Sequence, residues 1–282
     1  MFTAVLIFQL VQEHRIRLDE PVQRYLPGVL PADYPAIPVE TLLNHTAGLP
    51  SVHIPGEEDP QWILDHRYDD RTPAQVLAAA TQHPIEFAPG TMQMYTNTNY
   101  IVLGMLAEKL THQSYSHLLR SRITGPLGLC QTYYPDSDPR LANASARGYI
   151  SVDGRLVDAT EMNQSIPWAA GGMISTAADL DTFITALFRG RLVGPALLDR
   201  MFTVPGVQSS DGSPARFSDG LTTVTVNGVT LWGKTGSRYG YTDGVFATRD
   251  LARKIVYSIN ETSKTAEGQS GLVQKIGYAA TQ

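Results

Sequence analysis

Residues 231–242 read LWGKTGSRYGYT and bring a lysine, a threonine and a glycine together at the end of a strand-like run. Two more strand-like runs and a closing helical pattern follow before the chain ends. Upstream, Asn227-Gly228 is a strong signal for a tight β-hairpin turn. Residues from about 216 to 282 therefore predict antiparallel strands and a helix that packs on them.

The chain before this sheet predicts a helical lobe over residues 1 to about 205. Residues 1–11 form an almost continuous apolar run, although no capping Ser, Thr, Asp or Asn precedes it. A long helical pattern begins near Asn97, whereas residues 51–72 are polar and irregular and predict a surface loop. We therefore expect a single α+β domain over residues 1–282, with an antiparallel sheet flanked by helices.

The composition of the chain argues against several classes of function. The 282 residues are 43% hydrophobic, and the net charge is −5 with no basic block, which argues against a nucleic-acid partner. The apolar run at 1–11 is shorter than the roughly 20 residues of a membrane span. It also lacks the positive start and the cleavage site of a signal peptide. The single cysteine, Cys130, excludes an intrachain disulfide and is expected to be a small buried thiol.

A second short motif, MYTNTNY at 94–100, places Tyr95 and Asn97 just before a helix. Alone, such a pair is most often an aromatic anchor followed by a helix N-cap. A lone Lys-Thr-Gly is likewise most often an edge-strand charge followed by a turn. Neither motif is specific by itself, so their order and neighbours carry the argument.

Together the two motifs resemble the serine β-lactamase and penicillin-binding family, in particular its class C branch with D-alanyl-D-alanine carboxypeptidases and esterases. Seven segments are similar to the family in family order: FTAVLIFQLVQEHRIRLDEPVQRYLPG, LLNHTAGLP, PGTMQMYTNTNYIVLGMLAEKLT, PLGLCQTYY, ARGY, AAGGMISTAADLDTFITAL and GKTGSRYGYT. The resemblance implies a β-lactamase/transpeptidase-like fold and an acyl-serine mechanism on a D-Ala-D-Ala peptide, a β-lactam or a small ester. It implies no cofactor and no metal.

The resemblance also implies roles for individual residues. Tyr95 would share the proton transfers and protonate the leaving group, and Lys234 would supply positive potential, so these two are the candidate catalytic residues. The candidate substrate-binding residues are Asn97 for the substrate amide, Thr235 for a carboxylate or carbonyl, Gly236 for close approach along the strand, and Ser237 for half of an oxyanion hole through its N–H.

The nucleophile of the family, a serine in Ser-x-x-Lys at the start of a buried helix, has no counterpart in the sequence. The positions three before the five lysines are Leu106, Leu231, Leu251, Glu261 and Leu272. A nucleophile elbow is absent as well, because GQSGL around Ser270 ends in leucine where the motif has glycine. In the family this lysine lies about one position before the counterpart of Met1. We therefore expect an N-terminally truncated chain without the leading helix and first strands, inactive as it stands, with 253–261 at an open sheet edge.

Two other functional interpretations stay open: a non-catalytic relative that binds peptidoglycan stem peptides or β-lactams, and a decayed gene. For the intact family protein we expect a secreted or cell-envelope location. His45 is expected to be a packing histidine, while the loop histidines 53, 66 and 83 lack metal-ligand spacing and are expected to be solvated. Arg238 and Asp243 flank the Lys-Thr-Gly strand and would either shape specificity or form a surface pair.

Overall fold

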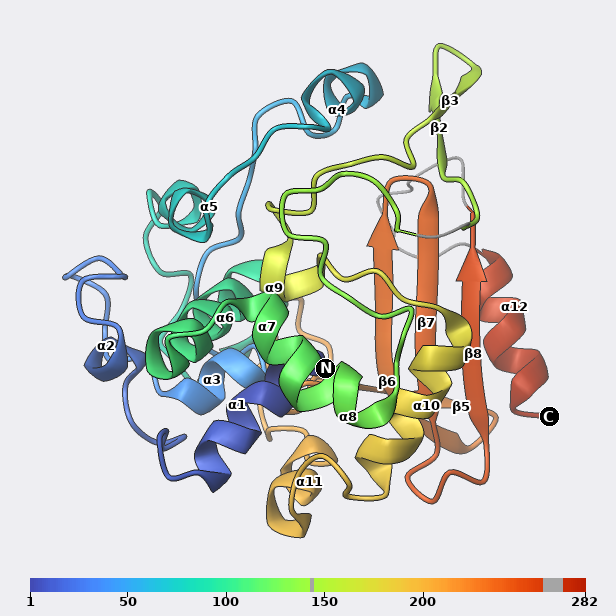
Figure 1. The fold of residues 1–282 in the computed structure, drawn as a ribbon. Helices are drawn as coiled ribbons and strands as arrows, with labels where there is room; N and C mark the ends of the chain where they lie inside the picture. Colours follow the sequence, from blue (N-terminus) through green and yellow to red (C-terminus); the bar gives the residue numbers. More distant parts are fainter. Residues whose placement is uncertain (143–144, 261–270) are drawn as a thin grey trace.

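The computed structural model describes residues 1–142, 145–260 and 271–282 and shows an α+β architecture (Figure 1). Its main sheet is antiparallel, in the order β5-β6-β7-β8. The strands are β5 (Thr222–Val226), β6 (Val229–Arg238), β7 (Tyr241–Ala247) and β8 (Lys254–Ile259). Helix α12 (Gly271–Ala280) covers one face of this sheet, and α10 (Ala177–Phe188) packs on the other.

The hairpin and edge predictions hold in this sheet. Asn227 and Gly228 both have positive φ values, 50° and 74°, as a tight β5–β6 turn requires. β8 is an outer strand of the sheet. Strand β5 pairs with β6 only from Val229 to Gly233, so the Lys234–Arg238 half of β6 extends beyond it.

Helix α1 (Phe2–Gln12) runs through the centre of the helical lobe and is buried on nearly all sides. Its Phe2 ring stacks on Phe183 of α10 with ring centroids 3.8 Å apart. The hydroxyl of Thr3 donates to the carbonyl of Ala169 at 2.6 Å and shares a 2.8 Å hydrogen bond with Tyr115. A helix that is apolar all round is stable only inside a core, and α1 is such a helix.

The other elements surround α1 and the sheet. The remaining helices are α2 (Val22–Tyr25), α3 (Val39–Leu43), α4 (Pro60–His66), α5 (Pro73–Ala80), α6 (Asn97–Thr111), α7 (Tyr115–Leu119), the π-helical turn η1 (Arg120–Thr124), α8 (Gly125–Leu127), α9 (Trp168–Gly171) and α11 (Pro195–Met201). The remaining strands are the parallel pair β1 (Met92–Gln93) and β4 (Gln208–Ser209) and the hairpin β2 (Tyr149–Val152) and β3 (Arg155–Asp158).

Two expectations from the sequence are wrong. Residues 51–72 are not all irregular, because α4 forms where the Asp59 side chain accepts a hydrogen bond from the Gln61 N–H and Pro60 occupies the first helical position. Its Ile63 and Leu64 are buried in a small apolar cluster that includes residues of the β2–β3 hairpin. Cys130 is exposed and not a buried thiol. The division of the chain into the two lobes near residues 205 and 216 stays a prediction.

The close packing of β6 against β7 gives a stability prediction. A Cβ at Gly233 would lie 1.9 Å from the main-chain oxygen of Val245, which cannot move without displacing β7. We expect Gly233→Ala to lower the free energy of unfolding by about 3 kcal/mol or to prevent folding, as overpacking does. Urea unfolding would measure this. The control is Gly206→Ala, where no atom lies within 4 Å and the change should stay within about 0.5 kcal/mol. Equal stability of the two variants would contradict the packing argument.

Candidate active site

Tyr95 and Asn97 lie where an extended segment enters α6. The side chain of Thr96 caps this helix by accepting a hydrogen bond from the Thr98 N–H at 3.2 Å, which fixes the direction of the two flanking side chains. The Tyr95 hydroxyl donates to Oδ1 of Asn97 at 3.2 Å. Tyr95 is 41% exposed, a high value for a large aromatic residue, so its phenol remains accessible from solvent.

Lys234 of β6 comes from the far end of the sequence and meets Tyr95. Its Nζ lies 4.7 Å from the centroid of the Tyr95 ring, within the range of a cation–π contact. The same ammonium donates to the main-chain oxygen of Thr235 at 3.0 Å. The two sequence motifs therefore form one site, and the charge that was expected near the phenol is present.

His45 lies beneath Tyr95, buried, with the two ring centroids 4.5 Å apart. Tyr100 and Phe217 also contact this imidazole, at 5.2 Å each. The Thr96 N–H donates to Nδ1 of His45 at 3.4 Å, so this ring nitrogen is an acceptor and the imidazole is neutral. Burial lowers the pKa of His45 well below its usual range, and the charge of Lys234 lowers it further. The expectation of a packing histidine is confirmed.

The beginning of α1 lies at the same place. Met1 lies close enough to Lys234 for an electrostatic interaction between the two residues. The first turn of α1, the Tyr95 loop and the Lys234 end of β6 thus converge from three distant parts of the chain. This is the position at which the family resemblance places the end of Ser-x-x-Lys.

The second half of β6 carries the other candidate substrate-binding residues. Lys234, Thr235, Gly236 and Ser237 pair with β7 on one side, while β5 ends its pairing at Gly233 on the other. Ser237 is exposed. An extended substrate could therefore add to this edge as a further strand.

Gly236 makes room for a neighbouring side chain as well. A Cβ at Gly236 would lie 2.6 Å from a carboxylate oxygen of Asp243, its partner on β7. Burial raises the pKa of Asp243, and the charge of Lys234 partly opposes this increase. Arg238 forms no ion pair with Asp243, since its guanidinium contacts Sδ of Met162 at 3.3 Å and lies over the Tyr239 ring. The surface-pair interpretation of these two residues is therefore wrong.

No pattern in the sequence indicated a role for Gln93, which holds the wall of the site. Its buried side-chain amide donates to the main-chain oxygens of Asn44 and Phe217, both at 2.8 Å. Its Oε1 accepts from the N–H groups of Arg216 and Phe217 at 2.8 and 3.0 Å. One glutamine thus joins the segments that place the His45, Tyr95 and Phe217 rings together, and the Phe217 contact was likewise not expected.

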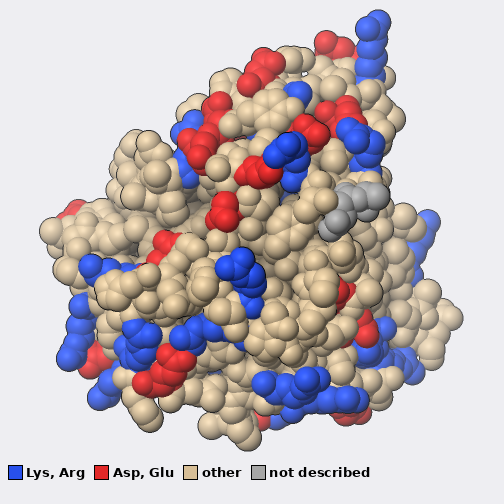
Figure 2. Space-filling view, viewed as in Figure 1, with Lys and Arg blue, Asp and Glu red and all other residues tan. Residues whose placement is uncertain are grey.

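Charge is spread over the surface without a dominant sign on the face that Figure 2 shows, where acidic and basic side chains alternate. This agrees with the small net charge of −5. Within the described parts of the chain, no helix combines the length and the apolar character that a membrane crossing needs. Ser270 lies outside the described residues.

Comparison with known proteins gives consistent matches along the chain. The family model "Beta-lactamase" matches residues 1–276. A D-stereospecific amidohydrolase from Streptomyces sp. is 35% identical with a TM-score of 0.87, over 99% of this chain and 83% of its own. The D-amino acid amidase from Ochrobactrum anthropi SV3, solved with D-phenylalanine, is 26% identical with a TM-score of 0.79, over 99% and 80%.

A curated relative extends beyond the matched region. Penicillin-binding protein 4 from Amycolatopsis lactamdurans is 30% identical over 188 residues, which are 65% of this chain and 47% of the relative. The chain thus matches about half the length of the first curated relatives.

The Gln93 hydrogen bonds predict a large loss of stability on truncation. Gln93→Ala leaves four partly buried main-chain groups without this partner, and we expect the free energy of unfolding to fall by about 2–4 kcal/mol. Urea unfolding would measure it, with the exposed Gln82→Ala as the control that should change stability by less than about 0.5 kcal/mol. If both glutamines tolerate alanine equally, the side chain of Gln93 does not hold the wall of the site.

The neutral His45 predicts acid sensitivity. The folded state holds the pKa of His45 well below its unfolded value of about 6.5, so only the unfolded state takes up a proton as the pH falls. The stability contribution of neutral His45 is complete above that value and declines below it, by up to about 2 kcal/mol at pH 5. We expect wild type to lose more unfolding free energy between pH 7 and pH 5 than His45→Asn. Parallel pH profiles of the two proteins would contradict this.

Proposed function

Because this chain belongs to the beta-lactamase family, we propose that the whole protein is a serine hydrolase that works through an acyl-enzyme. The observation that carries the proposal is the meeting of Tyr95, Asn97 and Lys234 at the first turn of α1. The simpler interpretations of the two motifs are a structural anchor and an edge-strand charge. Neither interpretation explains why the two motifs meet at one place.

The nucleophile in this proposal is a serine of a Ser-x-x-Lys sequence N-terminal to Met1. Its hydroxyl attacks the substrate carbonyl, and its proton passes to the neutral amine of the adjacent lysine, from which the Tyr95 hydroxyl relays it to the leaving group. When the tetrahedral intermediate collapses, the carbonyl carbon keeps the serine ester and releases the amine or alcohol, which takes the proton from Tyr95. A water then attacks the ester and gives a proton to the same lysine amine, which returns it to the serine oxygen as the acid and the free serine are released.

The remaining residues hold the substrate during these steps. The Ser237 N–H donates to the developing oxyanion together with the N–H of the nucleophile. The amide of Asn97 orients the substrate amide, and the Thr235 hydroxyl donates to a substrate carbonyl or carboxylate. Lys234 stabilises the negative charge of the transition state.

The substrate class that we favour is an amide or ester of a D-amino acid. Two relatives with high structural similarity are named for D-stereospecific amide hydrolysis. A D-Ala-D-Ala peptide and a β-lactam are the other substrates that the same acyl-enzyme chemistry serves. The similarity to a penicillin-binding protein supports a cell-envelope or secreted location.

A binding role is the second candidate, and the sequence supports it in one respect. The 282 residues contain no Ser-x-x-Lys, so the chain alone would bind peptidoglycan stem peptides or β-lactams without turning them over. The exposed Tyr95 and the edge of β6 would still form the binding surface.

Covalent labelling distinguishes the two candidates. We expect the 282-residue chain to give no adduct with penicillin or a fluorophosphonate in intact-mass spectrometry, because no activated serine is present. The in-frame DNA upstream of the Met1 codon should encode Ser-x-x-Lys, and the longer product should be acylated at that serine. A labelled serine in the 282-residue chain, or a stop codon close upstream, would overturn this assignment.

The longer protein also tests the role of Tyr95. Tyr95→Phe should keep the fold but slow acylation by about 100-fold or more, as expected for the loss of a general acid–base group. Tyr68→Phe, at another exposed tyrosine, is the control and should leave the acylation rate unchanged. The D-phenylalanine amide should be hydrolysed faster than its L enantiomer.

A further inference from the structure

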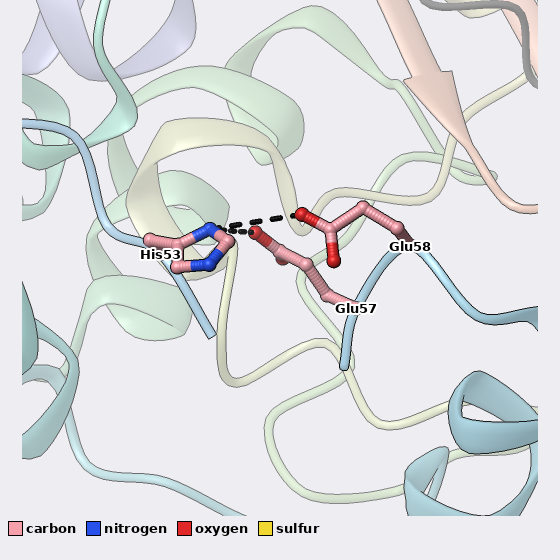
Figure 3. A group of neighbouring side chains, drawn as sticks. All are labelled: His53, Glu57 and Glu58. Carbon is pink, nitrogen blue, oxygen red and sulfur yellow. Dashed lines mark ion pairs between the residues drawn. The ribbon is translucent and has the colours of Figure 1, made fainter. Parts of the chain in front are cut away.

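Three metal-ligating side chains gather in the loop before α4, outside the candidate active site. Figure 3 shows the imidazole of His53 pointing toward the carboxylates of Glu57 and Glu58. One donor atom from each residue lies within 4.8 Å of the other two. His53 and Glu58 are exposed and Glu57 is half-buried, so an ion could reach all three from solvent.

The distances between these donor atoms fit ligands of one shared cation better than direct hydrogen bonds between the side chains. Nδ1 of His53 lies 3.5 Å from Oε1 of Glu57 and 3.8 Å from Oε1 of Glu58. Both distances exceed the usual range of N–H···O hydrogen bonds, about 2.7–3.2 Å. With zinc–ligand bonds of about 2.0–2.2 Å, two ligands of a tetrahedral ion lie about 3.3–3.6 Å apart. The His53–Glu57 separation of 3.5 Å falls within this range, and the His53–Glu58 separation of 3.8 Å is slightly longer.

The negative charges at this place are compensated only in part, by the electrostatic effect of Arg238 on Glu57 and by the Ile54 N–H, which donates to Oε1 of Glu57 at 3.4 Å. Among the described residues, no lysine or arginine lies within ion-pair distance of Glu57 or Glu58. His53 carries a charge only when it is protonated. Two neighbouring carboxylates that turn toward one imidazole repel each other, and a divalent cation would remove this repulsion.

We propose that His53, Glu57 and Glu58 form a binding site for a divalent transition metal, with Zn²⁺ as the ion that fits best. The ligands are Nδ1 of His53 and one oxygen from each carboxylate, and water completes the tetrahedron. The imidazole and the small number of donors favour Zn²⁺ over Mg²⁺ or Ca²⁺, which prefer six or more oxygen ligands.

The position of this site gives the ion a structural role. The Tyr239 hydroxyl donates to the main-chain oxygen of Glu57 at 3.4 Å, and Tyr239 follows directly on β6 with its substrate-binding edge. A bound ion would fix the 53–58 loop and, through this hydrogen bond, its contact with the turn after β6. The search for metal-ligand spacing among the histidines did not find this cluster, because two of its three proposed ligands are carboxylates.

Calorimetric titration of the metal-free 282-residue protein with ZnCl₂ tests the site. We expect saturable binding of one Zn²⁺ per chain, which excess Mg²⁺ does not displace. His53→Asn and the double variant Glu57→Gln/Glu58→Gln should each weaken binding by more than about tenfold, since even groups behind the ligands contribute 10- to 100-fold. Titration with Co²⁺ should give the visible absorption of a tetrahedral ion, lost in the same variants.

Matched exposed residues provide the controls. His83→Asn and Glu86→Gln remove the same chemical groups elsewhere on the surface and should bind Zn²⁺ as wild type does. The proposal is overturned if no saturable binding occurs, or if the His53 and Glu57/Glu58 variants bind as tightly as wild type. It is equally overturned if Mg²⁺ displaces the zinc. None of these readouts depends on the presence of a catalytic serine.

Discussion

The burial of α1 on all sides is the constraint on which the rest of the structure depends. An apolar helix of this kind needs neighbours around its whole circumference, and α6, α7, α9 and α10 supply them. Because α10 also packs on β7 and β8, α1 sets the distance between the helical lobe and the sheet. Its first turn then lies where β6 meets the loop before α6, and this places Lys234 beside Tyr95.

Local chemistry made much of this predictable from the sequence. The Asn227-Gly228 turn and the continuous apolar run of α1 each specify backbone geometry through nearby residues. The juxtaposition of Tyr95, Asn97 and Lys234 came instead from the order of motifs along the chain. Nothing in the local pattern of either motif fixes a contact between residues so far apart in sequence.

What escaped prediction consists of long-range side-chain contacts. Gln93 bonds main-chain groups near residues 44 and 216, and a polar side chain in a short strand carries no sign of such partners. Asp243 reaches over Gly236 because a glycine lies directly opposite on the neighbouring strand, a relation that only the β6–β7 register defines. The N-cap of α4 could be recognised in the sequence at Asp59-Pro60, but the polar composition of residues 51–72 led instead to the prediction of a loop.

The electrostatics of the site follow from the same geometry. Lys234 places a positive charge beside Tyr95 and close to Met1 at the beginning of α1. Because His45 beneath Tyr95 stays neutral, it does not compensate or compete with this positive potential. An anion that forms between α1 and the edge of β6 is therefore stabilised by the Lys234 charge. Acyl transfer needs this field for its oxyanion, whereas a purely structural junction would have no use for it.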